Sequence, residues 1–320
     1  MNHDPILIVS GEPNSVFFEI LFKTLKKIKI KSPLVLIGSY KLLKFQMNHF
    51  NFKYKIKLVD KKNIFHEKIY NNTINLIDVE YKFSNQFQKI SINSKNYIDT
   101  CFVIALELLN KNFTKKFING PISKNKYLDK KYPGITEFLA KKTKTKNYAM
   151  IIYNEKLSVA PITTHLPLKK ITKKITKKII IEKIKLIHNF YKINLKTKPK
   201  IAITGLNPHC ESNDKFNEEK KIIIPSIKYL RKNGFDTTGP FSADTLFLKN
   251  IRKKFNIIVG MYHDQVLGPM KTIFEYKAIN ITAGLPFIRI SPDHGPNEQM
   301  LGKNISNPES LIKAIKFLDY

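Results

Sequence analysis

The sequence predicts an α/β protein with a mostly parallel sheet, divided into two subdomains. Three observations support this class. Short apolar runs recur along the chain, and each ends at a glycine, a proline or a polar turn. Longer segments with the period of an amphipathic helix lie between these runs, which is the alternation expected when buried strands and helices follow one another. The chain has 320 residues, and at roughly 100–200 residues per domain this length suits about two domains.

The predicted strands are apolar and short enough to be buried in a sheet. They lie at residues 6–10, 34–37, 74–79, 117–118, 148–153, 201–204, 257–260 and 279–282. The predicted helices occupy residues 16–28, 97–109, 136–142, 171–191, 221–232 and 308–318. The sequence has no low-complexity linker, so we expect the two subdomains to be joined by crossing strands.

The net charge of +31 first suggests a nucleic-acid-binding protein, but the kind of cation argues against it. Lys and Arg number 56 against 25 Asp and Glu, and the arginines are Arg231, Arg252 and Arg289 alone. Proteins that grip phosphates or read bases usually keep arginine, because its planar fork bonds two acceptors at once. Lysine is instead spread along the whole chain. We interpret the charge as solvated surface and expect no nucleic-acid partner.

The densest lysine run, residues 169–185, has isoleucines four apart and predicts an amphipathic helix with a lysine-rich exposed face. Such a helix can lie on a membrane, but motifs with chemical content flank it, so we expect it on a globular domain. No apolar run approaches the ~18 residues of a membrane span, and residues 1–13 lack the basic region of a signal peptide. Cys101 and Cys210 form no CxxC pair, which favours a reducing compartment. We therefore expect a cytoplasmic protein without a membrane partner.

Histidines follow several of the predicted strands, in polar and glycine-containing loops. They are His165, His209, His263 and His294. In open α/β sheets, ligands bind beyond the carboxyl ends of the strands, so these loops can converge on one site. Imidazole suits Zn²⁺ and other first-row divalent ions, and three protein ligands leave a position for substrate. The spacing of the histidines matches no local metal motif, and the chain has neither GxGxxG nor a P-loop.

Arg289 is unusual in a chain that nearly always uses lysine. Its place in LPFIRISPDHG suggests a position where lysine would not serve, such as one facing a carboxylate or a phosphate. Lys271 and Asn280 lie just upstream, and together the three residues could form an anion clamp. We interpret Arg231 and Arg252 as surface residues.

A set of motifs then occurs in a fixed order along nearly the whole chain: GPISKNKY (120–127), PGITEFLA (133–140), TTHLPL (163–168), GLNPH (205–209), GPFSADTLF (239–247), MYHDQ (261–265) and NITAGLPFIRISPDHG (280–295). This set resembles the 4-hydroxythreonine-4-phosphate dehydrogenase (PdxA) family of vitamin B6 synthesis. GKNISNP (302–308) is also similar to the adenine-side loop of the related isocitrate and isopropylmalate dehydrogenases.

The resemblance implies a homodimer whose subunit has two α/β/α subdomains with a cleft between them, as in isocitrate and isopropylmalate dehydrogenases. The first subdomain would comprise residues 1–125 and approximately 300–320, and the second approximately 126–299, with the metal and substrate motifs and the dimer interface.

The resemblance also assigns roles to residues. The divalent metal (Zn, Mg or Co) would be bound by His165, His209 and His263. Substrate contacts would fall on Thr136, Lys271, Asn280 and Arg289, and a cofactor contact on Asn307. Asp244 and Asp264 are the catalytic candidates. Asp264 adjoins a predicted ligand histidine, so it is a candidate both for the proton acceptor and for a residue that orients the histidine.

The implied reaction is the oxidation of 4-phosphooxy-L-threonine by NAD or NADP. Its product, 2-amino-3-oxo-4-phosphooxybutanoate, is a β-keto acid, which loses CO₂ to give 3-amino-2-oxopropyl phosphate for pyridoxine 5'-phosphate synthesis. A metal would lower the pKa of the substrate hydroxyl, and Lys271 and Arg289 would fix the anionic substrate.

Three segments depart from the family pattern. The first loop reads GEPNSVFFE (11–19) in place of GDPAGIGPE, Ile135 replaces a histidine in PGHTE, and HGPNEQMLG (294–302) replaces HGTAFDIAG. Ile135 cannot donate a hydrogen bond to substrate. These departures leave two alternatives to the leading prediction: a related dehydrogenase acting on a four-carbon sugar-acid phosphate, or a catalytically degenerate relative. The net charge of +31 leaves a third alternative, a basic protein that binds anions or nucleic acid.

Overall fold

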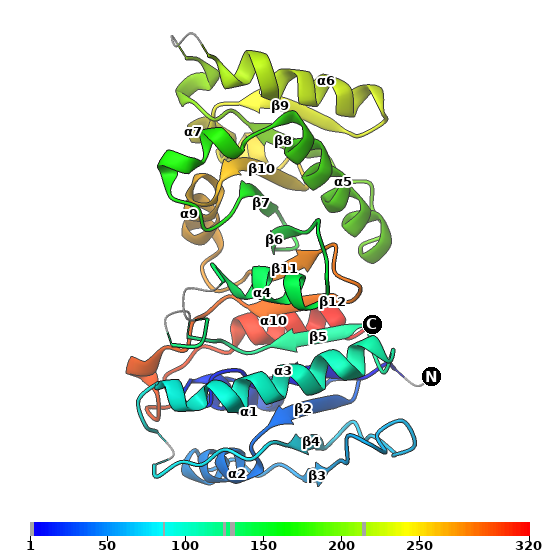
Figure 1. Cartoon of the computed structure of the whole chain (residues 1–320), viewed down its shortest axis with the longest axis vertical. Coiled ribbons are helices and arrows are strands. Elements are labelled where there is room, and N and C mark those ends of the chain that lie inside the picture. Colours follow the sequence, from blue (N-terminus) through cyan, green and yellow to red (C-terminus); the bar gives the residue numbers. More distant parts are fainter. Residues whose placement is uncertain (1–2, 86, 124–125, 129–131, 213–215) are drawn as a thin grey trace. The chain divides into compact units, whose positions relative to one another are not determined.

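The computed structural model describes residues 3–85, 87–123, 126–128, 132–212 and 216–320. The chain divides into two compact units (Figure 1). The first unit comprises Met1–Leu139 and Pro286–Tyr320, and the second comprises Ala140–Leu285. The units change over at 139/140 and 285/286, whereas the sequence-based limits lie near 125 and 300.

The described strands of the first unit are all paired in parallel. Their order is β3 (Ile56–Leu58), β4 (Ile74–Asp78), β2 (Leu34–Gly38), β1 (Ile6–Val9), β5 (Lys116–Asn119) and β12 (Ile288–Pro292). All four residues of β1 are buried, because parallel sheets are covered on both faces. β12 lies beside β5 although some 170 residues separate them in sequence.

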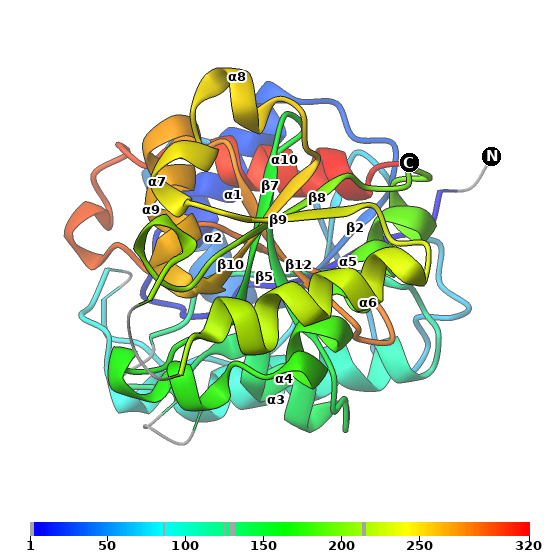
Figure 2. The same ribbon diagram turned by 90° about the horizontal axis from the view of Figure 1, so that it is seen from above.

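Helices cover both faces of this sheet. α3 (Lys95–Asn110) packs on β1 and β2 from one side, and α1 (Phe17–Lys27), α2 (Tyr40–His49) and α10 (Glu309–Leu318) lie on the other (Figure 2). α2 begins where the Ser39 side chain accepts a hydrogen bond from the Leu42 amide, at 3.3 Å, which satisfies a backbone donor that the first turn would leave open. α4 (Ile135–Lys142) begins in the first unit.

The second unit has a mixed sheet. Its order is β11 (Ile279–Ala283), β6 (Ala149–Tyr153), β7 (Ser158–Thr163), β10 (Ile257–Tyr262), β8 (Ile201–Thr204) and β9 (Thr237–Phe241). The strands from β7 to β9 pair in parallel, and β6 is antiparallel to both of its neighbours. β6 and β7 are joined by a short turn, which permits only an antiparallel pair.

Helices α5 (Lys177–Asn194) and α6 (Ile224–Lys232) lie on one face of the second sheet. α7 (Ala243–Leu246), α8 (Lys249–Arg252) and α9 (His263–Phe274) lie on the other (Figure 2). The lysine-rich run forms two short 3₁₀ turns before α5, which begins at Lys177 after a Thr176 cap. Ile180, Ile184 and Ile187 are buried on α5, as an amphipathic helix requires.

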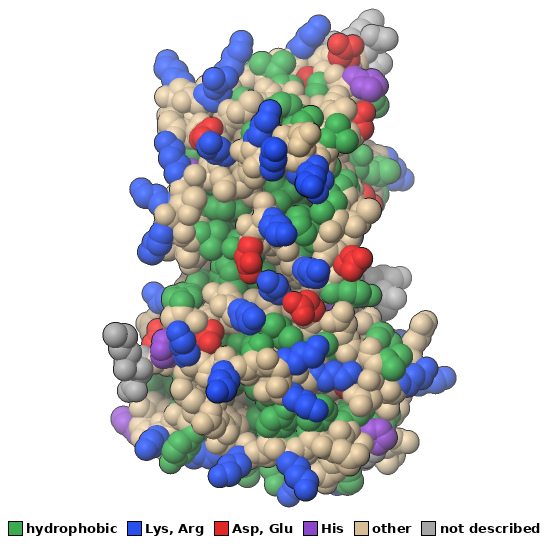
Figure 3. Space-filling model, turned by 180° about the vertical axis from the view of Figure 1, so that it is seen from behind, with side chains coloured by type: hydrophobic (Ala, Val, Ile, Leu, Met, Phe, Trp, Pro, Cys, Tyr) green, Lys and Arg blue, Asp and Glu red, His purple; other side chains and the backbone are tan. Residues whose placement is uncertain are grey.

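Lysine and arginine side chains are dispersed on the visible surfaces of both units rather than gathered into one patch (Figure 3). This agrees with the interpretation of the charge as solvated surface. Among the described residues, no helix is both long and apolar enough to cross a bilayer.

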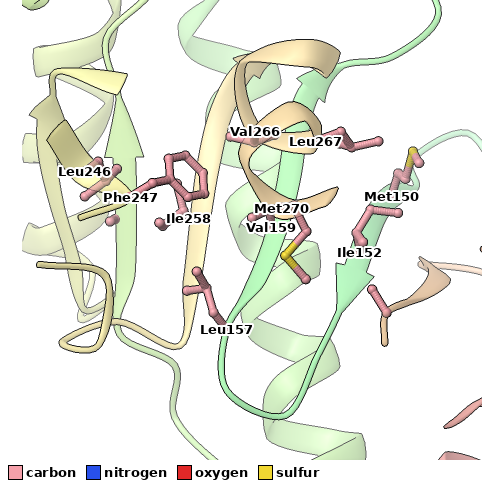
Figure 4. Close-up of a cluster of buried hydrophobic side chains, with 12 residues drawn as sticks. Met150, Ile152, Leu157, Val159, Leu246, Phe247, Ile258, Val266, Leu267 and Met270 are labelled. Carbon is pink, nitrogen blue, oxygen red and sulfur yellow. The ribbon is translucent and has the colours of Figure 1, made fainter. Parts of the chain in front are cut away.

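A buried apolar cluster in the second unit holds α9 against the sheet (Figure 4). Val266, Leu267 and Met270 of α9 belong to the same cluster as Val159 of β7 and Ile258 of β10. Burying each such side chain stabilises the fold by roughly 1.5–3 kcal/mol. The packing therefore fixes the first turn of α9, which carries the MYHDQ histidine, at the end of β10.

Candidate active site

The three predicted ligand histidines follow three neighbouring strands of the second unit. His165 comes two residues after β7, His263 directly follows β10, and His209 comes five residues after β8. β10 lies between β7 and β8, and all three strands are parallel. Their carboxyl ends therefore share one edge of the sheet, where open α/β folds bind ligands.

Two of these histidines are brought together. The ring centres of His165 and His263 lie 5.7 Å apart, with their planes at 39°. Nδ1 of His263 lies 2.6 Å from Oδ1 of Asp264. Because a carboxylate can only accept, Nδ1 of His263 donates and its Nε2 is left to bind another group. Asp264 thus has the position of a residue that orients His263.

Two of the histidine loops have unusual backbone geometry. His165 has a φ of 41° and His209 a φ of 54°, followed by Cys210 at 61°. A residue other than glycine in this region costs on the order of 1–3 kcal/mol, and such residues are common at ligand sites. The fold therefore holds both histidines in conformations that local preference disfavours.

The pair of His165 and His263 suits a divalent metal ion. At Zn–N distances of about 2.0–2.1 Å, two imidazoles on one ion have ring centres about 5 Å apart, close to the spacing of this pair. Among the described residues of the chain, no group of three or more His, Cys, Asp or Glu side chains is placed to bind one ion. The chain thus brings together two of the three predicted ligands, and His209 lies outside that pair.

Arg289 lies in β12 of the first unit and its side chain is completely buried. Its Nε donates to Asn119 Oδ1 at 2.6 Å, and its Nη1 donates to Thr136 Oγ1 at 3.3 Å. Burial lowers the pKa of Arg289 to about 9, and the charge of Glu137 acts in the opposite direction. The guanidinium is therefore still a cation at neutral pH, enclosed by protein.

Thr136, a predicted substrate contact, is the second residue of α4; it is itself buried and contacts this cation. Asn119, at the end of β5, has the shorter bond to Arg289 but is absent from the sequence-based prediction. A single asparagine at a strand end has no spacing signal, and its position before Gly120 in the GPIS motif was the available clue. Ile135 is half-buried at the first position of α4.

Asn280 and Lys271 belong to the second unit. Asn280 is the second residue of β11, opposite Ile152 of β6. Its Oδ1 is buried and has no hydrogen-bond partner among the described residues. Buried acceptors are rarely left unpaired, so this atom is available to a ligand donor. Lys271 is exposed on α9, on the same helix as His263.

Comparison with known proteins decides the family. The family model described as "Pyridoxal phosphate biosynthetic protein PdxA" matches residues 29–318. The chain belongs to the PdxA family. A 4-hydroxythreonine-4-phosphate dehydrogenase from a Sulfurihydrogenibium species is 40% identical over 317 residues, covering 97% of this chain and 96% of the relative. A D-threonate 4-phosphate dehydrogenase from Salmonella typhimurium is 31% identical over 323 residues, covering 99% and 98%.

Solved structures agree with this assignment. A 4-hydroxythreonine-4-phosphate dehydrogenase from Klebsiella pneumoniae superposes with a TM-score of 0.82 at 30% identity, covering 98% of each chain. Isocitrate dehydrogenase from Methylococcus capsulatus superposes with a TM-score of 0.52 at 10% identity, covering 98% of this chain and 84% of that one. The predicted α/β class with an isocitrate dehydrogenase-like fold is confirmed, as is the PdxA resemblance.

The remaining predicted residues are exposed. Asp244 lies in the first turn of α7, where its Oδ1 accepts from the Thr245 amide at 2.9 Å. Asn307 Oδ1 accepts from the Glu309 amide at 2.9 Å, where α10 begins. Neither bond joins these residues to the His165–His263 pair or to Arg289.

Two of the departures from the PdxA pattern touch each other. The Val16 amide in the first loop donates to the Pro296 carbonyl in the 294–302 loop at 3.1 Å. Glu12 is buried in the first loop and accepts from the Asn14 amide and from Ser94 Oγ. Burial raises the pKa of Glu12 to about 7, and the charge of Glu298 adds to the rise. The two altered loops are therefore one local packing unit around a buried carboxyl group.

Proposed function

We propose that this PdxA-family chain is a nicotinamide-dependent dehydrogenase that oxidises 4-phosphooxy-L-threonine, using NAD or NADP, in the synthesis of pyridoxine 5'-phosphate. Hydride leaves C3 for the nicotinamide and the hydroxyl proton leaves for a base, which gives 2-amino-3-oxo-4-phosphooxybutanoate. The bond between C1 and C2 then breaks, CO₂ leaves and C2 takes up a proton, which gives 3-amino-2-oxopropyl phosphate. Relatives with this named activity align over nearly the full chain, which supports the assignment.

The observation that carries the proposal is the fully buried Arg289. Its guanidinium is a planar fork of donors, which suits a carboxylate or a phosphate group of the substrate. Asn119 and Thr136 hold two guanidinium nitrogens, so the fork has a fixed direction before the substrate arrives. We propose Lys271 and the open Oδ1 of Asn280 as further substrate contacts.

We propose that His165, His209 and His263 bind the divalent metal, which can be Zn, Mg or Co. When bound, such an ion lowers the pKa of a coordinated hydroxyl and polarises a ketone. Asp264 keeps the proton on Nδ1 of His263, which leaves the lone pair of Nε2 able to bind a ligand. That role leaves Asp244 as the candidate to accept the hydroxyl proton.

We further propose Asn307 as a cofactor contact, and a homodimer acting in the cytoplasm.

The test is the formation of reduced nicotinamide from 4-phosphooxy-L-threonine by the purified protein, with NAD and NADP compared. The assay is repeated after chelation and after Zn²⁺, Mg²⁺ or Co²⁺ is restored. We expect turnover that chelation abolishes and a divalent ion restores. A folded protein that gives no turnover with any of these ions would overturn the proposal.

A second candidate substrate is D-threonate 4-phosphate, a four-carbon sugar-acid phosphate. It shares the carboxylate, the C3 hydroxyl and the phosphate, and carries a hydroxyl instead of an amino group at C2. Two observations favour it: a relative with this named activity aligns over 99% of the chain, and Ile135 replaces the family histidine beside Thr136. The ratio of kcat/KM for the two substrates decides between them, and the Ile135→His variant tests whether residue 135 sets that ratio.

A further inference from the structure

The Gln265 side chain joins the ends of two strands in the second unit. Its Oε1 accepts from Thr204 Oγ1 at 2.8 Å and from the Met261 amide at 2.7 Å. Its Nε2 donates to the Gly205 carbonyl at 2.8 Å. One amide group thus makes three hydrogen bonds, two to the end of β8 and one to β10.

These contacts lie where two of the histidine loops leave their strands. Thr204 and Gly205 begin the loop that carries His209, and Met261 lies two residues before His263. Gln265 itself is the third residue of α9, whose first residue is His263. Because the Gln265 side chain bonds the start of both loops, it sets the distance between them.

Neighbouring residues add further hydrogen bonds between the ends of the same strands. Thr163 Oγ1, at the end of β7, donates to the Met261 carbonyl at 2.8 Å, so the strand that precedes His165 is also tied to β10. Glu219 is buried, and its Oε1 accepts from the Leu206 and Asn207 amides at 2.8 and 2.9 Å. The loop that leads to His209 is therefore fixed by a buried carboxylate as well as by Gln265.

Two glycines leave space for the side chains of Gln265 and Glu219. A Cβ at Gly260 would come within 3.0 Å of Gln265 Oε1 and 2.5 Å of Val266 Cγ1. A Cβ at Gly205 would come within 3.1 Å of Glu219 Oε1. A larger residue at either position would displace the side chains that tie the loops.

We propose that Gln265 is a positioning residue, which acts through His209 and His263 by fixing the two loops that carry them. The proposal rests on the proposed function, since it gives these histidines a metal to bind. Gln265 suits the role because both ends of its amide are used: the oxygen bonds two donors and the nitrogen bonds one acceptor.

The test compares two substitutions at this position. Gln265→Met keeps the length of the side chain and removes all three hydrogen bonds. Gln265→Glu keeps the acceptor for Thr204 and Met261 but places an oxygen against the Gly205 carbonyl. Gln88→Met is the matched control, because Gln88 is also partly buried and its Nε2 donates to Tyr81 OH at 2.9 Å in the first unit.

Three experiments are made: calorimetry for the Co²⁺ affinity of the metal-free protein, steady-state kinetics for kcat and for KM for NAD(P), and amide hydrogen exchange in residues 204–210 and 261–265. For Gln265→Met we expect Co²⁺ affinity to fall about tenfold or more, as for other residues that orient metal ligands. We expect kcat to fall with little change in KM for NAD(P), and exchange to rise in both segments. Gln265→Glu should show the same changes to a smaller degree, and Gln88→Met should match the wild type.

Unchanged Co²⁺ affinity and unchanged exchange in a folded Gln265→Met would overturn the positioning role. If the methionine variant does not fold, the same comparison is made with Gln265→Glu. Hydrogen exchange also distinguishes a failure of this inference from a failure of the proposed function. A wild-type protein that neither binds Co²⁺ nor oxidises the substrate contradicts the proposed function. Even then, faster exchange in both loops of the Gln265 variant would support the role of Gln265 in fixing the loops.

Discussion

The Arg289 region of the first unit and the histidine loops of the second are organised in opposite ways. Arg289 is completely buried within a regular strand and bonded to two side chains. His263 has a side chain 35% exposed, and its partner Asp264 is 85% exposed. Burial and two side-chain hydrogen bonds fix the guanidinium, whereas hydrogen bonds at the ends of the strands fix the loops that carry the imidazoles. Changes at Arg289 should therefore reduce stability and activity together, and changes at the histidines should reduce activity alone.

The largest effect is expected for Arg289→Lys. Lysine keeps the charge but cannot donate to both Asn119 and Thr136 from a planar fork, so a buried cation loses its partners. We expect kcat/KM to fall at least ~100-fold and the free energy of unfolding to fall by about 3 kcal/mol. Steady-state kinetics and urea unfolding measure both. Arg231→Lys, at an exposed position, is the control. A fivefold or smaller loss of activity with unchanged stability would remove the contrast between the two regions.

His263→Gln tests the other side of the comparison. Loss of an imidazole ligand should weaken Co²⁺ binding by about 100-fold or more while leaving the melting temperature within about 2 °C, since the side chain is partly exposed. Calorimetry and thermal unfolding measure the two quantities. His66→Gln changes an exposed histidine of the first unit and should alter neither. A large drop in melting temperature for His263→Gln would mean that the histidine loops, too, depend on burial.

Glu12 gives a pH-dependent test within the first unit. Its pKa is raised from 4.5 to about 7, so between these values the folded protein binds more protons than the unfolded chain. The stabilising contribution of the protonated carboxyl is complete below pH 4.5 and is lost as pH rises through about 7. The Glu12→Gln variant has no carboxyl group to ionise at this position. Its free energy of unfolding minus that of wild type should therefore rise by up to about 3 kcal/mol from about pH 4 to about pH 8.

Urea unfolding across that pH range measures the difference, and Glu80→Gln, at an exposed position, is the control. A constant difference between Glu12→Gln and wild type at every pH would show that Glu12 ionises normally in the folded protein.

The smallest effect is expected for Asp264→Asn. The amide can still bond Nδ1 of His263, but it carries no charge and no longer fixes the proton on that nitrogen. Co²⁺ affinity should fall by about tenfold, the low end of the range for residues that orient metal ligands. Calorimetry on the metal-free protein measures it. If Asp264→Asn instead binds Co²⁺ normally and loses kcat by about 100-fold or more, Asp264 is the proton acceptor rather than the orienting residue.

The strands that the sequence predicts are those rich in apolar residues. β1 and β2 are almost entirely apolar runs, and three of the five residues of β4 (INLID) are apolar. β7 was not predicted, because Pro161 in SVAPIT is atypical of a strand interior. β12 was also absent, since Arg289 and Pro292 interrupt its apolar residues.

The site residues, too, divide into those that the sequence predicts and those that only the structure shows. The rarity of arginine singled out Arg289, and the family motifs supplied Thr136 and the histidines. Asn119 and Gln265 gained their roles only from strand register: β5 beside β12 in one unit, and β8 beside β10 in the other. Such contacts join residues 170 and 60 positions apart, and no local pattern encodes them. The full burial of Arg289 likewise depends on residues distant in the sequence, such as Asn119 and Thr136, so no local pattern predicts it.

The most direct test is the initial rate of NAD(P) reduction with 4-phosphooxy-L-threonine and with D-threonate 4-phosphate, for wild type, Arg231→Lys and Arg289→Lys, with and without a restored divalent ion. We expect metal-dependent turnover of at least one of the two substrates by wild type and Arg231→Lys, and a rate at least ~100-fold lower for Arg289→Lys. Absence of turnover of both substrates by folded, metal-loaded wild type, or equal rates for the two arginine variants, would contradict it.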